Sequence, residues 1–210
     1  MATAAGGQKR EANILLIGDG AVGKTSLVNV YAGKGFQDVH MATLGLDFIS
    51  QDVKPKSAPN SSYNLKIWDT AGQERFKSLT MTFYKQSQGM MICFDLTKPK
   101  TFESVRRWIV AVKSNCEANV ATLLIGNKCD LTDERAVTRE EAEQLAADNN
   151  MQYFETSARG SINVQEAFVQ MIDQVYQNKF ATAAENPPPA RDTIKLGRGS
   201  EKQARAKQEE

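Results

Sequence analysis

The chain has 210 residues, with 26 Lys or Arg against 25 Asp or Glu and a formal net charge of +1 at pH 7. This balance excludes a global field favouring nucleic acid or an acidic partner, and the length suits one core with tails rather than two full domains. The three cysteines are widely spaced, residues 1–7 lack the regions of a signal peptide, and no apolar run reaches the roughly 18 residues of a membrane span. We therefore expect a soluble, cytoplasmic protein with reduced thiols and no nucleic-acid partner.

Short β-type runs recur along the chain. Nearly continuous apolar segments at 13–18, 89–96 and 121–127 predict strands that are buried on both faces of a parallel sheet. The runs at 45–53 and 63–69 flank a segment rich in Pro, Ser and Asn, which indicates a turn. These two runs therefore predict an antiparallel hairpin.

Helical periodicity fills the intervals between these runs. A strand followed by a helix, repeated along the chain, predicts a doubly wound α/β sheet. Beyond residue 179 the chain has three consecutive prolines and few large apolar residues, a composition typical of disorder. The predicted organisation is a flexible extension at 1–10, a folded domain at 11–179 and a disordered tail at 180–210. The predicted helices lie at 24–33, 101–117, 138–149 and 163–178.

The segment GDGAVGKTS, residues 18–26, fits the pattern G-x-x-x-x-G-K-[ST] and lies between a predicted strand and a predicted helix. Glycines allow the backbone N–H groups to converge on a phosphate. Lys24 adds a positive charge, and Thr25 offers a hydroxyl group to Mg²⁺. By itself this motif predicts a bound nucleotide without saying which one.

The segment NKCD, residues 127–130, directly follows the predicted strand at 121–127. The Asp130 carboxylate can accept hydrogen bonds from the N1–H and the N2 amine of guanine, whereas adenine offers neither donor, so Asp130 would reject ATP. Asn-Lys-x-Asp is also a common turn, and only its combination with the phosphate loop points to guanine.

The segment ETSA, 155–158, closes another short strand. Its backbone N–H groups could meet the guanine O6, although Ser-Ala after a strand is often an ordinary loop.

With these motifs in order over residues 10–180, the chain resembles the Rab proteins of the Ras superfamily of small GTPases. The segments WDTAGQERF, 68–76, and TLGLDF, 43–48, resemble a Rab signature and the Rab effector loop. The resemblance implies a P-loop NTPase fold with a mostly parallel six-stranded sheet, one antiparallel edge strand and helices on both faces. It also implies a small GTPase domain at 11–179 that hydrolyses GTP to GDP slowly and acts as a switch in vesicle traffic.

The resemblance further implies the roles of individual residues. Mg²⁺ would be held by Thr25 and Thr43 and, through a water molecule, by Asp69. Gln73 would orient the attacking water, with Lys24 and Thr43 as further catalytic residues. Phe36 would pack against the base, although it could also be a Phe at the edge of the core. The positions that bind GTP or GDP are Gly20, Ala21, Val22, Gly23, Lys24, Thr25, Ser26, Phe36, Thr43, Gly72, Asn127, Lys128, Asp130, Ser157 and Ala158.

The switch implied by the resemblance has two loops. Thr43 and Gly72 would contact the γ-phosphate, and both loops would relax once it leaves. An exchange factor, an activating protein and effectors would read this difference, and we expect the protein to be a monomer. Candidate contacts are Phe48, Trp68 and Phe83, although three aromatic residues beside a sheet are equally typical of a core.

Two features of the chain depart from the Rab pattern, and other functions stay open. The terminal residues RAKQEE contain no cysteine for prenylation. Either the natural chain continues further or the protein works without a lipid, so a peripheral position on an intracellular membrane stays open. The hairpin loop at 54–62 is a few residues longer than in most Rab proteins. Alternative functions are a nucleotide-binding scaffold without turnover and a P-loop ATPase or kinase, which Asp130 opposes.

Overall fold

The computed structural model describes residues 10–37, 46–70 and 77–181. Within these ranges, six strands form one sheet in the order β2-β3-β1-β4-β5-β6. The edge strand β2 pairs antiparallel with β3, and the other pairs are parallel. This confirms the predicted α/β architecture, including its single antiparallel edge strand. The strands are β1 Glu11–Ile17, β2 Leu46–Val53, β3 Tyr63–Thr70, β4 Gly89–Asp95, β5 Ala121–Asn127 and β6 Gln152–Thr156.

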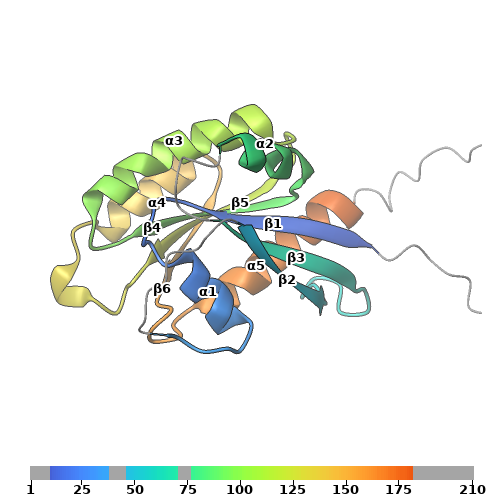
Figure 1. Ribbon diagram of the computed structural model, residues 1–210, viewed down its shortest axis with the longest axis horizontal. Helices are drawn as coiled ribbons and strands as arrows, with labels where there is room; N and C mark the ends of the chain where they lie inside the picture. Colours follow the sequence, from blue (N-terminus) through green and yellow to red (C-terminus); the bar gives the residue numbers. More distant parts are fainter. Residues whose placement is uncertain (1–9, 38–45, 71–76, 182–210) are drawn as a thin grey trace, which may run out of the picture.

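Helices cover both faces of the sheet (Figure 1). The helices α2, α3 and α4 lie on one face, and α1 and α5 lie on the other. None of them, within the described ranges, combines the length and the apolar character needed to cross a lipid bilayer. The helical elements are α1 Lys24–Tyr31, α2 Lys77–Gln86, α3 Pro99–Asn115, the 3₁₀ turn Thr132–Glu134, α4 Arg139–Asp148, α5 Val164–Tyr176 and the π-helix Gln177–Ala181.

The four helices expected from periodicity are present, but the sequence analysis missed α2. Its ten residues, KSLTMTFYKQ, include Thr, Phe and Tyr, which fit strands as well as helices. Tyr84 is buried near its end, in the core layer formed with α3 and α4. The helix therefore depends on packing against the sheet more than on local propensity.

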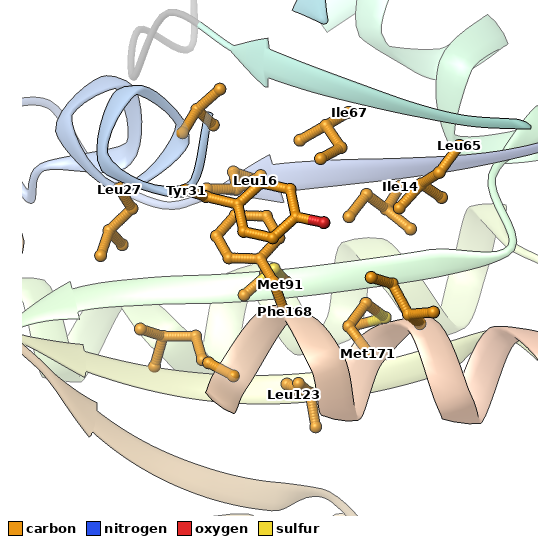
Figure 2. Close-up of a cluster of buried hydrophobic side chains, with 14 of the residues drawn as sticks. Ile14, Leu16, Leu27, Tyr31, Leu65, Ile67, Met91, Leu123, Phe168 and Met171 are labelled. Carbon is orange, nitrogen blue, oxygen red and sulfur yellow. The ribbon is translucent and has the colours of Figure 1, made fainter. Parts of the chain in front are cut away.

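The sheet divides the core into two layers because successive strand residues point to opposite faces. In β1, Ile14 packs in the layer of α1 and α5, whereas its neighbour Leu15 packs in the layer of α3 and α4. Figure 2 shows the first layer, where the Tyr31 ring of α1 stacks on the Phe168 ring of α5, with 4.1 Å between the ring centroids. Strands buried on both faces explain the unbroken apolar runs of the sequence.

The long loop between β2 and β3 is docked on α5. The Ser57 N–H and hydroxyl both donate to the Asp173 Oδ1, at 3.1 and 3.3 Å. The Tyr176 hydroxyl donates to the Ser61 Oγ at 3.0 Å, and the Tyr63 hydroxyl donates to the Ile172 carbonyl at 2.8 Å. Ser57 and Ser61 thus fix this loop to the helix.

The packed domain continues past the boundary predicted at residue 179. Phe180 is only 9% exposed, and its ring centroid lies 5.1 Å from that of Tyr63. The Arg10 guanidinium lies over the Phe180 ring, 5.6 Å from its centroid. The chain after α5 is therefore anchored by the Phe180 ring, together with hydrogen bonds from Asn178 to the Asn119 carbonyl at 2.7 Å and from Lys179 to the Glu11 carbonyl at 2.6 Å.

We expect Phe180→Ala to lower the free energy of unfolding by about 3 kcal/mol, because the substitution removes a buried ring and leaves a cavity against Tyr63. Urea denaturation followed by circular dichroism measures the change. Val110→Ala is the control, since Val110 is 62% exposed on α3 and its truncation should change stability by less than about 0.5 kcal/mol. Equal effects of the two substitutions would contradict the anchoring role of Phe180.

Candidate functional site

The predicted motifs meet where the parallel strands of the sheet have their carboxyl ends. The phosphate loop follows β1, and NKCD and ETSA follow the adjacent strands β5 and β6, while Asp69 lies near the end of β3. These strands are parallel, so their carboxyl ends share one edge. In open α/β sheets this edge is where ligands bind.

Two glycines shape the phosphate loop. Gly18 has φ +142°, and a Cβ atom there would lie 2.1 Å from the Cys93 carbonyl oxygen. Gly23 caps the N-terminus of α1 with φ +98°, and a Cβ atom there would lie 2.3 Å from the Asn127 Nδ2. Ala21, at the turn between them, also has a positive φ of 59°. The loop therefore curls tightly over a helix N-terminus, an arrangement that suits a phosphate group.

Lys24 folds back over this loop. Its side chain is buried, and its Nζ donates to the carbonyl oxygens of Gly18 at 2.9 Å and Asp19 at 2.8 Å. Burial lowers the pKa of Lys24, although the nearby carboxylates of Asp69 and Asp19 partly oppose this shift. A poorly solvated ammonium group beside converging backbone amides can bind a phosphate strongly.

The buried side chain of Asn127 joins the three motifs. Its Nδ2 donates to the Val22 carbonyl of the phosphate loop at 2.8 Å. Its Oδ1 accepts from the Thr156 hydroxyl of the ETSA segment at 3.2 Å. The Cys129 N–H also donates to the Thr156 carbonyl, at 3.0 Å. The phosphate-binding and base-reading segments are thus one connected unit.

Residues of the ETSA loop make hydrogen bonds with one another. Ser157 and Ala158 are buried, and the Ser157 N–H donates to the Ile162 carbonyl at 3.1 Å. The Ser157 hydroxyl accepts from the Gly160 N–H at 2.8 Å. The expected contact of this loop with the guanine O6 therefore cannot use the Ser157 amide, and the Ala158 amide is the next along the chain.

Thr25 and Asp69 fit a divalent cation. The Thr25 hydroxyl donates to the Asp69 Oδ2 at 2.6 Å, while the buried Asp69 Oδ1 has no hydrogen-bond partner among the described residues. Burial raises the pKa of Asp69, against the Thr25 hydrogen bond and the Lys24 charge. A hydroxyl oxygen beside a carboxylate that lacks one partner is a donor set suited to Mg²⁺.

The rim of the base site carries Phe36, Asp130 and Arg159. Phe36 is 37% exposed, and the Arg159 guanidinium lies 5.6 Å from its ring centroid. This exposure argues against the interpretation of Phe36 as a core residue. Asp130 is half-buried in the turn after Asn127, as a residue that reads a base edge should be.

The remaining predicted site residues divide into two groups. Gly20 is exposed in the phosphate loop, and Ser26 is half-buried in the first turn of α1. Thr43, Gly72 and Gln73 lie outside the described residues. The structure therefore bears on the phosphate loop and the base-reading segments, and not on the two switch loops.

The three aromatic residues predicted as partner contacts form one stack over β2, β3 and α2. The Trp68 ring centroid lies 4.6 Å from that of Phe48 and 4.6 Å from that of Phe83, and the ring planes are tilted by 36° and 55°. Phe48 is about half exposed. The Trp68 indole N–H donates to the Asn13 Oδ1 at 3.1 Å. The stack thus opens onto the protein surface at Phe48.

Sequence reasoning missed several residues around the site. The Trp108 indole of α3 donates to the Asp19 Oδ1 of the phosphate loop at 2.9 Å. Arg135 donates two hydrogen bonds, at 3.0 and 2.6 Å, to the carboxylate of Glu155, the first residue of the ETSA segment. Asp95 is fully buried at the end of β4. Only Asp95 had a local signal, because an acid that ends a buried apolar strand needs a partner.

Comparisons with known proteins agree with this geometry. Residues 13–177 match the Ras family. The chain is 43% identical over 155 residues to the Ras-related protein Rab-13 of Rattus norvegicus, covering 74% of this chain and 75% of the relative. It is 41% identical over 165 residues to the Ras-related protein RABA5b of Arabidopsis thaliana, covering 79% of this chain and 75% of that relative. The Ras-related protein Rab-10 of Diplobatis ommata is 36% identical over 164 residues, with 78% and 80% covered. The chain therefore belongs to the Ras family, and it is a Rab-like small GTPase.

Proposed function

We propose that this Rab-like small GTPase binds GTP or GDP across the phosphate loop and the NKCD and ETSA segments, hydrolyses GTP slowly, and acts as a switch in intracellular membrane traffic. The observation that carries the proposal is the Asn127 bridge, which joins the Val22 carbonyl to the Thr156 hydroxyl. A ligand with both a phosphate chain and a base can occupy the two ends of such a unit at once.

The phosphate end would be held by charge and by backbone amides. Lys24 would exchange its contacts with the Gly18 and Asp19 carbonyls for phosphate oxygens, which carry full negative charge. Thr25 and Asp69 would hold Mg²⁺, with Asp69 acting through a water. Bound there, Mg²⁺ would neutralise negative charge that develops on the phosphate group during transfer.

The base end would select guanine. The Asp130 carboxylate would accept from two donors of the guanine edge, and the Phe36 ring would cover the base. Adenine would leave that carboxylate desolvated and without a donor. The proposed residues supply positioning and electrostatic stabilisation, the terms on which phosphoryl transfer chiefly depends.

Gln73→Leu tests turnover. A leucine has a similar size but cannot donate to or accept from the attacking water, so we expect single-turnover hydrolysis of bound GTP to slow at least tenfold. The rate is measured as phosphate release from GTP-loaded protein with Mg²⁺. Intrinsic hydrolysis itself should be on the order of 10⁻⁴ s⁻¹, the scale of small GTPases without an activating protein.

The controls separate the competing functions. The nucleotide content of the loaded protein, measured before and after the reaction, shows whether the Gln73→Leu variant still binds GTP. Hydrolysis no faster than in buffer, from fully loaded wild-type protein, would instead favour a nucleotide-binding scaffold. Retention of ATP rather than GTP would overturn the proposal.

The partners would bind the aromatic stack of Phe48, Trp68 and Phe83, which β2, β3 and α2 support. An exposed aromatic ring backed by two others offers a rigid apolar contact of the kind found at binding hot spots. We propose that exchange factors, activating proteins and effectors use this surface, and that the protein works as a monomer in the cytoplasm or peripherally on an intracellular membrane.

A further inference from the structure

The Asp95 carboxylate is a buried charge beside the base-reading turn. Its side chain is 0% exposed at the end of β4. The N–H and the hydroxyl of Thr97 both donate to its Oδ1, at 2.9 and 2.7 Å. The Lys128 Nζ lies 2.6 Å from its Oδ2 in an ion pair. A buried carboxylate is costly unless it is paired, so this arrangement has a defined partner.

Lys128 is the strained residue of the turn. Its φ is +70°, in the left-handed region that non-glycine residues rarely adopt. Backbone bonds hold the residues on either side: the Leu96 N–H donates to the Asn127 carbonyl at 3.0 Å, and the Cys129 N–H donates to the Thr156 carbonyl at 3.0 Å. The ion pair with Asp95 adds a side-chain constraint at the residue where the backbone is least favourable.

We propose that Asp95 is a positioning residue for the guanine pocket, which holds Lys128 and with it the turn that presents Asp130 to the base. This inference rests on the proposed function, since it assumes that the NKCD turn reads guanine. Asp95 acts from beneath the turn, through Lys128. It thereby slows the escape of the nucleotide.

The electrostatics agree with this role. Burial raises the pKa of Asp95, but the Lys128 ammonium and the two Thr97 donors outweigh burial and leave the pKa below its usual value. The carboxylate is therefore charged at neutral pH. The Lys128 side chain is 26% exposed, so once unpaired it can turn toward water. Loss of the pair should free the turn without unfolding the domain.

The test is Asp95→Asn. The asparagine Oδ1 can still accept from both Thr97 donors, while its NH₂ group would face the Lys128 ammonium and repel it. We expect dissociation of a fluorescent GDP analogue, chased with excess GDP, to become about tenfold faster, the size of one charge-assisted contact. The midpoint of urea unfolding, measured without nucleotide, should change little by comparison.

Two further variants separate positioning from a general structural effect. Thr97→Val removes a hydroxyl from the other carboxylate oxygen and leaves the Lys128 pair intact, so its dissociation rate should stay close to wild type. Lys128→Met removes the charge but keeps most of the side-chain length. If Asp95 acts through Lys128, the double variant should release the GDP analogue about as fast as Lys128→Met alone.

Each outcome has one meaning. An Asp95→Asn protein that releases the GDP analogue at the wild-type rate would overturn the inference while leaving GDP binding established. The inference would also be overturned if the increases in dissociation rate caused by Asp95→Asn and Lys128→Met multiplied in the double variant. It would be overturned as well if Thr97→Val raised the rate as much as Asp95→Asn does. Either result would assign Asp95 a structural role. A wild-type protein that binds no GDP analogue would overturn the proposed function itself.

Discussion

Asp130→Ala is expected to abolish the preference for guanine. Two charge-assisted hydrogen bonds, worth about 1.5–3 kcal/mol each, would be lost, so GDP affinity should fall about 10²- to 10⁴-fold. The affinity for ADP should rise, because the adenine edge gives that carboxylate no donor and the substitution removes its desolvation penalty. Competition by GDP and ADP against a fluorescent guanine nucleotide, or calorimetric titration where binding is weak, measures both affinities.

Asp133→Ala is the matched control for this prediction. Asp133 is an exposed acid in the 3₁₀ turn three residues further along, and its removal changes the local charge equally. We expect the control to bind GDP like the wild type. If Asp130→Ala and Asp133→Ala weakened GDP binding to the same small extent, the carboxylate of Asp130 would not be reading the base.

Gly23→Ala is expected to damage both the phosphate loop and the fold. The added methyl group would lie 2.3 Å from the Asn127 Nδ2, at a φ of +98°. The left-handed conformation costs an L-residue about 1–2 kcal/mol. A displaced Asn127 would also leave the Val22 carbonyl and the Thr156 hydroxyl without their partner, at about 1–3 kcal/mol for each buried group.

The expected result is a drop of about 3 kcal/mol in the free energy of unfolding, measured without nucleotide, and a loss of GDP affinity of at least a hundredfold. Gly33→Ala separates strain from steric clash. Gly33 also has a positive φ, +75°, but a Cβ atom there would meet nothing within 4 Å. Its alanine variant should lose about 1 kcal/mol of stability and bind GDP normally. Similar GDP affinities in both variants would refute the steric role of Gly23.

These predictions share one structural cause, which is the close contact between segments that lie far apart in the sequence. Asn127 and Val22 are separated by 105 residues. Gly23 must be a glycine because the Asn127 side chain occupies the space beside it. A change in the phosphate loop is therefore felt in the base-reading turn, and the reverse also holds.

The sequence by itself determined the phosphate loop, the order of the motifs and most of the strands. Glycine spacing dictates a local backbone curve, and unbroken apolar runs require burial on both faces of a sheet. These signals act over a few residues, so they can be read directly from the chain. The same local signals failed for α2, whose Thr, Phe and Tyr residues are ambiguous until the sheet is present to pack against.

Only the tertiary structure decided which side chains meet. The order β3-β1-β4-β5-β6 brings Asp95 beside Lys128 and Val22 beside Asn127, and no local pattern specifies which strands become neighbours. Phe180 likewise belongs to the domain because Tyr63, on a distant strand, covers its ring. Residues with chemistry of their own were visible in the sequence, whereas the residues that position them depend on contacts that exist only after the sheet has formed.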